Sequence, residues 1–299
     1  MMINDKRTDI LARLDAMLVQ EAVQETTATT RCFDYFKSKR SGSVDESCRK
    51  SMVKWLQQVQ STLKLSPDTV WIAMSIFDRY LCSSRGGSAR ALEDKCKFQL
   101  AAITAFYTAV KIHEPVVLGI DMLLVVCRHA YTEDDFVTME MDILSAINWR
   151  VSCHTAIDYA RTLLELFCDD EHLPSDIANG LLGDCEKQMG DAIADIRFLC
   201  CKQSELGIYC VAFSLAENKW LSLSEKEAVW VRLSESCDVD LSLMGGAASQ
   251  EYIAKASPCK PNTVSKLGTS SQRLPSAALS KYSAGSSSPV CISCTARKA

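Results

Sequence analysis

The chain has 299 residues, which is enough for about two domains, and its composition is ordinary for a soluble globular protein. Its formal net charge is −4, but all six charged residues beyond Ser257 are basic, so 27 basic and 37 acidic residues precede them and give a net charge of −10. Such an acidic body excludes nucleic-acid binding through its general surface.

No window approaches the roughly 18 uninterrupted apolar residues of a membrane span, and the start lacks a signal peptide's basic-then-apolar layout. We therefore expect a protein of the nucleus and cytoplasm. The 15 cysteines are an odd number, mostly on apolar helical faces, which predicts reduced core residues; the alternative is a disulfide or zinc protein. Cys291 and Cys294 have zinc-ligand spacing, but no second pair or histidine lies near them.

Residues 1–46 are predicted to form an amphipathic helix, ending near Ala28, and a charged connecting segment. The helix either docks on the rest of the chain, which we favour, or waits for a partner. Its apolar positions recur at spacings near 3.6 and are Ile10, Leu11, Leu14, Met17 and Leu18.

Two helices are predicted next. The first, from Ser47 to Leu63, has an apolar stripe, and Trp55 lies beside that stripe, where partial exposure is expected. The second starts with Ser66 as N-cap and Pro67 at the first helical position, and it ends at a serine- and glycine-rich break.

A central helix is predicted from Phe98 to Lys111, because this stretch is apolar on nearly every side. A short helix from Gly119 to Cys127 and a fifth helix introduced by Thr132 follow. Glu140 lies on the buried stripe of the fifth helix, where an unpaired carboxylate costs several kcal/mol. Lys111 and Glu140 are therefore predicted partners, and a buried salt bridge that only holds two helices in register is the structural alternative.

After Trp149 the helical pattern begins again and predicts a second helical domain over residues 152–256. Its expected helices span His154 to Phe167, Pro174 to about Leu199, Gln203 to Asn218, and Ser224 to Ser236. Residues 257–299 lose the periodicity and are rich in serine and proline, which predicts a disordered basic tail. Ser257 and Ser288 each precede a proline there and are candidate phosphorylation sites, with an unmodified tail as the alternative.

Four fragments, in order, resemble the cyclin family over roughly residues 47–151. Arg49 and Trp55-Leu56 match the first box helix, and Phe77-Asp78-Arg79-Tyr80-Leu81 is similar to the family's Leu-Asp-Arg-Phe-Leu. Ala109-Val110-Lys111 with Glu114 resembles its Ala-x-Lys-x-x-Glu ending, and Met139-Glu140 with Ile143-Leu144 resembles its Met-Glu-x-x-Ile-Leu signature.

The resemblance implies an all-α fold of tandem five-helix cyclin boxes, clear over residues 47–151 and divergent over 152–256. It implies a noncatalytic subunit that binds and activates a cyclin-dependent kinase, in cell-cycle control, without a cofactor or metal. Lys111 and Glu140 match the family's kinase-interface pair, and Trp149 and Val151 are further candidates for that interface. No nucleic-acid or membrane partner is expected.

Other positions carry family roles within the first box. Arg49 and Asp78 match a structural pair. A groove for short substrate or inhibitor motifs is implied at Met52, Trp55 and Gln99, although Cys48, Ser51 and Lys54 depart from its pattern. No Leu-x-Cys-x-Glu retinoblastoma-binding motif appears near the N-terminus, so a D-type-like assignment lacks that support.

Three alternatives remain open. A transcription-related cyclin-box protein would contact DNA or polymerase and need a basic face, whereas this body is acidic. A cyclin-box scaffold would have lost kinase binding. An enzyme is the least favoured reading, because the sequence shows no nucleophilic grouping and no glycine-rich phosphate loop.

Overall fold

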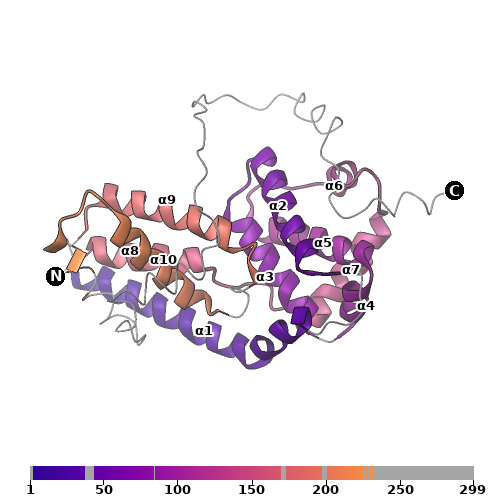
Figure 1. The fold of residues 1–299 in the computed structure, drawn as a ribbon, viewed down its shortest axis with the longest axis horizontal. Coiled ribbons are helices and arrows are strands. Elements are labelled where there is room, and N and C mark those ends of the chain that lie inside the picture. The colour runs from indigo at the N-terminus through magenta and orange to yellow at the C-terminus, as the bar shows by residue number, and fades with distance from the viewer. Residues whose placement is uncertain are drawn as a thin grey trace. The chain divides into compact units, whose positions relative to one another are not determined.

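The computed structural model describes residues 3–37, 44–83, 85–169, 173–196 and 201–224, together with residues 226, 227, 229 and 231. Over the described residues up to 217 there are ten α-helices, and no described residue lies in a β-strand, which confirms the all-α prediction (Figure 1). Within the same residues, no helix has both the length and the apolar character needed to cross a membrane.

The helices follow one another with short connections. Their bounds are α1 Ile3–Lys37, α2 Glu46–Leu63, α3 Asp68–Cys82, α4 Ser88–Glu93, α5 Lys95–His113, α6 Ile120–Val126, α7 Glu133–Ala146, α8 Ala156–Asp169, α9 Ser175–Ala192 and α10 Gln203–Glu217. Residues 223–231 are also helical wherever the structure describes them.

Helix α5 is the central helix of the first group, as its apolar pattern predicts. It packs against α2, α3, α4 and α7, and the side chains from Phe98 to Phe106 are all buried. Phe98 meets Phe77 of α3 edge to face, with ring centroids 4.9 Å apart. An all-round apolar helix is stable only inside such a shell of other helices.

The predicted start signals operate as expected. The Ser66 hydroxyl accepts a hydrogen bond from the Asp68 amide at 3.3 Å, while Pro67 already has helical dihedral angles (φ −55°, ψ −34°). Thr132 and Asp135 form a reciprocal capping box at the start of α7. These caps supply hydrogen-bond acceptors for backbone amides of the first helical turn, which have no acceptor within the helix.

Three features differ from the sequence-based expectation. The six-residue helix α4 was not predicted, and α1 continues to Lys37, through part of the expected connecting segment. Trp55 is only 3% exposed, so the expected partial exposure is wrong. Its burial comes from neighbouring elements, which the pattern of its own helix does not encode.

A second group consists of helices α1, α8, α9 and α10. Gly207 of α10 allows a close approach to α8, because a Cβ there would lie 2.6 Å from the Ala156 carbonyl oxygen. Helix α1 is docked, as we favoured from the sequence: Leu14 and Met17 are buried, and the Tyr159 hydroxyl donates to the Met17 carbonyl at 2.9 Å.

Helix α2 fastens the two groups together. The Arg49 Nη1 donates to the Ile193 carbonyl at 2.8 Å, and the Gln57 Nε2 donates to the Gly190 carbonyl at 2.7 Å. The domain boundary predicted between residues 151 and 152 and the tail predicted over 257–299 stay predictions, and the tail lies outside the described residues.

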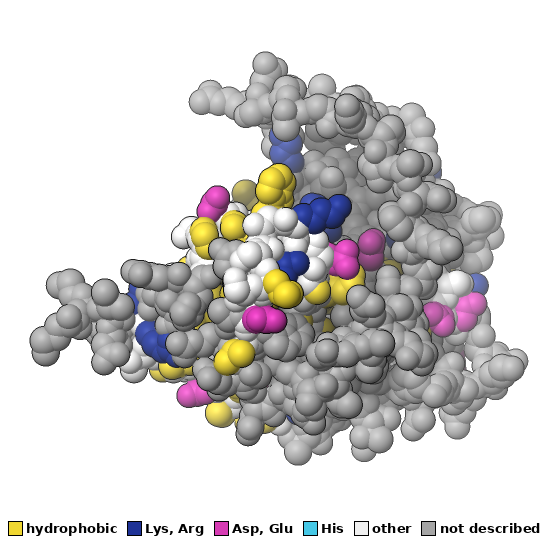
Figure 2. Space-filling view, turned by 60° about the vertical axis from the view of Figure 1, so that its left-hand side comes forward, with side chains coloured by type: hydrophobic (Ala, Val, Ile, Leu, Met, Phe, Trp, Pro, Cys, Tyr) yellow, Lys and Arg dark blue, Asp and Glu magenta, His cyan; other side chains and the backbone are white. Residues whose placement is uncertain are grey.

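On the face drawn in Figure 2, described charged side chains of both signs lie among hydrophobic ones.

The cysteines follow the prediction only in part. Seven described cysteines form no disulfide bond: Cys48, Cys127, Cys153, Cys168, Cys185, Cys201 and Cys210. Burial raises the pKa of Cys127 to about 12, so this thiol stays protonated at neutral pH. Cys82 and Cys96 are disulfide-bonded, so the prediction of reduced cysteines is wrong for these two.

Candidate functional site

Lys111 and Glu140 meet across α5 and α7. Lys111 lies in the last turn of α5, and its Nζ forms an ion pair with Glu140 Oε1. The Thr108 hydroxyl donates to the same Glu140 oxygen at 3.0 Å, and the Lys111 Nζ lies 4.6 Å from the centre of the Tyr107 ring. The two charges are thus fixed in direction by neighbours on α5.

This ion pair is at the surface rather than in the core. The Lys111 side chain is 39% exposed and that of Glu140 is 18% exposed. The apolar run around Lys111 and the position of Glu140 on its stripe had suggested a buried pair, and that expectation is corrected. Lys111 begins an exposed stretch because α5 emerges from its shell there, so the pair can be reached by another protein.

Exposed hydrophobic side chains lie close to the pair in the sequences of α5 and α7. Ile112 follows Lys111 and is 44% exposed. Val137 and Met141, both 52% exposed, lie three residues before and one residue after Glu140, on the outward side of α7. Charged groups close to exposed hydrophobic side chains are typical of protein-binding surfaces.

Trp149 and Val151 lie in the turn after α7. Trp149 is 61% exposed and Val151 is intermediate. Asn148 and Trp149 both have left-handed backbone conformations, with φ of +55° and +61°. This conformation is uncommon outside glycine, and here it presents the indole to solvent.

Arg49 and Asp78 form a buried bidentate ion pair. Arg49 Nε donates to one carboxylate oxygen at 3.1 Å and Nη2 to the other at 2.8 Å, and the side chains are only 4% and 11% exposed. Nη1 is occupied by the Ile193 carbonyl. The arginine therefore joins α2 to α3 and to the end of α9.

Glu114 has a role that the sequence did not reveal. Its Oε1 accepts a hydrogen bond from the Ser66 amide at 2.8 Å and another from the Thr69 hydroxyl. The carboxylate thus caps the start of α3 and is attracted by the positive end of its helix dipole. The sequence singles out Glu114 only as the acid that closes the Ala-x-Lys-x-x-Glu fragment, and that fragment does not indicate a contact with α3.

The predicted groove residues do not form an open surface in the described structure. Met52, Trp55 and Gln99 are 0%, 3% and 2% exposed. The Tyr131 hydroxyl donates to Gln99 Oε1 at 3.1 Å, so the oxygen of the Gln99 amide already accepts a hydrogen bond within the chain. Substrate docking at these residues stays a prediction, and it would require them to be uncovered.

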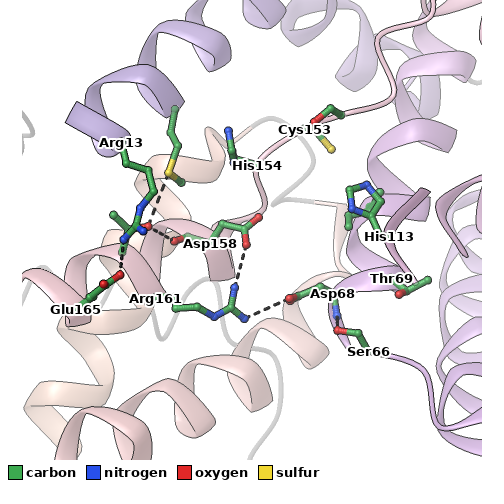
Figure 3. A pocket seen from close by; sticks show the side chains of 14 residues that line it. Arg13, Ser66, Asp68, Thr69, His113, Cys153, His154, Asp158, Arg161 and Glu165 are labelled. Carbon is green, nitrogen blue, oxygen red and sulfur yellow. Dashed lines mark hydrogen bonds and ion pairs between the residues drawn. The ribbon is translucent and has the colours of Figure 1, made fainter. Parts of the chain in front are cut away.

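A cavity of about 430 Å³ lies where α1, α3, α8 and the end of α5 meet (Figure 3). Arg161 of α8 reaches between two carboxylates, with ion pairs to Asp68 at 3.2 Å and Asp158 at 3.0 Å. His113 lines the same cavity from the end of α5. The charges inside are mostly satisfied by one another.

The cavity alters two pKa values. Burial raises the pKa of Asp68, which Asp158 raises further, whereas Arg161 and His113 lower it. Burial also lowers the pKa of His113, and the carboxylates of Asp158, Asp68 and Glu114 act in the opposite direction. In both cases desolvation outweighs the surrounding charges.

Metal and modification sites find no support among the residues that the structure describes. There, no group of three or more His, Cys, Asp or Glu side chains is placed to hold a metal ion. Ser257, Ser288, Cys291 and Cys294 all lie outside the described residues.

Comparison with known proteins shows what the first helical group is similar to. Residues 17–152 match the family model described as cyclin, N-terminal domain. The match begins within α1 and ends just after the Trp149 turn, so it includes Lys111, Glu140 and the Arg49–Asp78 pair.

Curated relatives agree. The chain is 30% identical to the G1/S-specific cyclin CCN1 of Candida albicans over 169 residues, which are 54% of this chain and 22% of the relative. It is 35% identical to G2/mitotic-specific cyclin-B3 of Drosophila melanogaster over 101 residues, which are 34% of this chain and 16% of the relative. The chain thus spans less than a quarter of the length of either relative.

A solved structure supports the fold over a wider range. The viral cyclin from herpesvirus saimiri superposes with a TM-score of 0.59 at 17% identity, covering 81% of this chain and 97% of the viral one. Because that range exceeds the family match, the likeness extends into the second helical group. The chain therefore contains a cyclin N-terminal domain over residues 17–152, and its fold is similar to that of a cyclin over a wider range.

Proposed function

We propose that this chain is a noncatalytic regulatory subunit that binds and activates a cyclin-dependent serine/threonine kinase in cell-cycle control, in the nucleus and cytoplasm. The observation that carries the proposal is the exposed Lys111–Glu140 pair with hydrophobic side chains beside it. The match to the cyclin N-terminal domain and the cell-cycle names of the relatives support it.

The pair keeps unused hydrogen-bonding capacity for a partner. Both described contacts of Glu140 fall on Oε1, which leaves Oε2 open to a donor. The Lys111 ammonium has three donors, of which the carboxylate uses one. The ends of partner helices offer these complements, with free amides at a helix N-terminus for the glutamate and free carbonyls at a helix C-terminus for the lysine.

Activation would follow from binding one kinase conformation better than another. The kinase helix that carries the glutamate partner of the ATP-binding lysine must be held inward for phosphoryl transfer. Docking of that helix on Lys111, Glu140 and the apolar side chains around them would favour the inward state. The cyclin would then perform no chemistry itself.

The test compares charge-removing variants that preserve side-chain size. The tagged full chain and a Lys111→Met, Glu140→Gln double variant are used to capture a cyclin-dependent kinase, and histone phosphorylation is measured on the captured material. The matched control is a Lys187→Met, Asp184→Asn double variant, because that pair is also a surface lysine–acid ion pair but lies on α9. Only the first variant should lose kinase and activity.

A scaffold is the second candidate, because the Lys111–Glu140 contact already joins α5 to α7 within the chain. On that reading the pair only holds these helices in register. Equal kinase capture by the wild type and the correctly folded double variant would favour the scaffold, as would no capture by either.

A further inference from the structure

The turn that follows α7 contains two successive residues in the left-handed backbone conformation. Asn148 and Trp149 have φ of +55° and +61°, and Trp149 is 61% exposed. Asparagine adopts this conformation more readily than most residues, whereas for a bulky residue such as tryptophan it is costly. The direction in which the indole points therefore depends on what stabilises this turn.

Backbone hydrogen bonds stabilise the turn, but they are not particular to it. The Trp149 amide donates to the Leu144 carbonyl at 2.8 Å. The turn after α6 has the same form: Arg128 and His129 have φ of +54° and +55°, and the His129 amide donates to the Leu124 carbonyl at 2.7 Å. The two turns thus share their backbone bonds and differ in their side-chain contacts.

A side chain from outside α7 supports the turn at Trp149. Arg85 Nη1 donates to Asn148 Oδ1 at 2.8 Å, and the two residues are 63 positions apart in the chain. Among the described residues, no side-chain hydrogen bond reaches Arg128 or His129 in the other turn. Because its donor is charged, the Arg85 hydrogen bond is stronger than one between neutral groups. It ties the residue before Trp149 to the connection between α3 and α4.

The residues that follow Arg85 are held on α7 by Asp142. Asp142 Oδ2 accepts hydrogen bonds from the Gly87 amide at 2.8 Å and from the Tyr80 hydroxyl at 2.7 Å. A Cβ at Gly86 would overlap the Asp142 carboxylate, so glycine is required for this close approach. The Arg85 side chain therefore reaches Asn148 from a backbone that is already fixed against α7.

We propose that Arg85 is a positioning residue for the kinase interface: its hydrogen bond to Asn148 keeps the turn in the conformation that presents Trp149 to the partner. This inference rests on the proposed function, in which Trp149 is a candidate for the interface. Without the hydrogen bond the turn would relax toward less strained backbone conformations, and the fraction of molecules ready to bind would fall. Arg85 acts through the turn and does not touch the kinase.

The first measurement uses the full chain alone. The indole N–H signals are recorded by NMR on a chain with ¹⁵N-labelled tryptophan, and the Trp149 signal is assigned with Trp149→Phe. Arg85→Met removes the donor and should shift or split the Trp149 signal. Arg90→Met is the control, because it changes an exposed arginine on α4, and it should leave the signal unchanged. An unchanged Trp149 signal in Arg85→Met overturns the proposal, whether or not the chain binds a kinase.

The second measurement is the affinity for a purified cyclin-dependent kinase, determined by titration calorimetry. Arg85→Met should weaken binding roughly fivefold, as expected for the loss of one hydrogen bond. The same substitution should have no effect in an Asn148→Gly background, because glycine adopts the left-handed conformation without support. Arg90→Met should bind as the wild type does.

The two backgrounds separate positioning from direct contact. An equal loss in both would overturn the proposal and indicate that Arg85 contacts the kinase itself. Wild-type affinity in Arg85→Met would overturn it as well. Absence of kinase binding by the wild type would contradict the proposed function instead, and the Trp149 signal would then decide whether Arg85 holds the turn.

Discussion

Arg49 illustrates how one side chain can hold three helices together. Its guanidinium is occupied by the Asp78 carboxylate and the Ile193 carbonyl, and almost none of it reaches solvent. Truncation would leave a buried carboxylate without a partner.

We expect Arg49→Ala to lower the free energy of unfolding by about 3–5 kcal/mol, because the Asp78 charge would lose its buried partner. Chemical denaturation measures the change. Arg161→Ala is the comparison, since that arginine is 44% exposed and its ion pairs should contribute no more than about 1 kcal/mol. Similar losses for both variants would show that burial does not set the value of the Arg49 pair.

His113 should make stability depend on pH. Its pKa in the folded chain is lowered from 6.5, mainly by burial, so the unfolded chain binds the proton more readily. The stability that this histidine contributes is therefore complete above pH about 6.5 and is lost as pH falls through its folded pKa. Replacement by Gln should reduce the decline between pH 7 and pH 5 in thermal unfolding. An unchanged decline in the variant would rule out this histidine as its cause.

Single residues show what sequence can and cannot specify. The pairing of Lys111 with Glu140 follows from two charges on apolar stretches, each of which needs a partner. The exposure of these two side chains does not follow from the sequence, because it depends on where α5 leaves its shell of helices. The prediction for Trp55 was wrong in the opposite direction, because neighbouring elements bury a side chain that its own helix places beside the apolar stripe.

Among the helices, α8 and α10 approach each other closely at Gly207. A Cβ at this position would meet the Ala156 carbonyl at 2.6 Å and the Tyr159 Cβ at 2.7 Å, and both contacts are with parts of the chain that cannot rotate away. Gly183 of α9 is a matched helical glycine with open space around it.

We expect Gly207→Ala to destabilise the protein by about 1–3 kcal/mol through overpacking. Gly183→Ala should instead stabilise it by about 0.5–1 kcal/mol, because alanine restricts the unfolded chain and favours helix. Denaturation midpoints of the two variants should move in opposite directions. A stabilising Gly207→Ala would contradict the tight contact between α8 and α10.

At the element scale, the sequence specified most of the helices because caps and periodicity are local. Thr132 with Asp135 marks the start of α7, and Ser66 marks the start of α3. Helix α4 was missed because six residues contain less than two turns and show no clear period. The extension of α1 beyond Ala28 was missed because its charged residues resemble a connecting segment.

Across the whole described molecule, the candidate interface lies on the first helical group, and the contacts that join the two groups lie elsewhere. Lys111, Glu140 and the Trp149 turn belong to α5, α7 and the residues that follow α7. The second group contacts the first through α1, through Arg49 and Gln57 of α2, and through the Arg161–Asp68 ion pair. This separation lets a variant at the proposed interface lose binding without losing the fold.

The loss of affinity should be large. Removing one partner of an interfacial charge pair costs at least about 2 kcal/mol, so Glu140→Gln should weaken kinase binding by roughly thirtyfold or more. Titration calorimetry with the purified kinase measures it. The stability of the free chain should change little, because the ion pair is partly exposed. Wild-type affinity in this variant would remove Glu140 from the interface.

Hydrogen–deuterium exchange of the full chain, with and without a cyclin-dependent kinase, tests the central claim most directly. The account predicts that kinase binding slows exchange in the last turn of α5, in α7 and in the turn at Trp149, while α9 remains unchanged. Protection confined to α9 and α10, or no protection at α5 and α7, would contradict it.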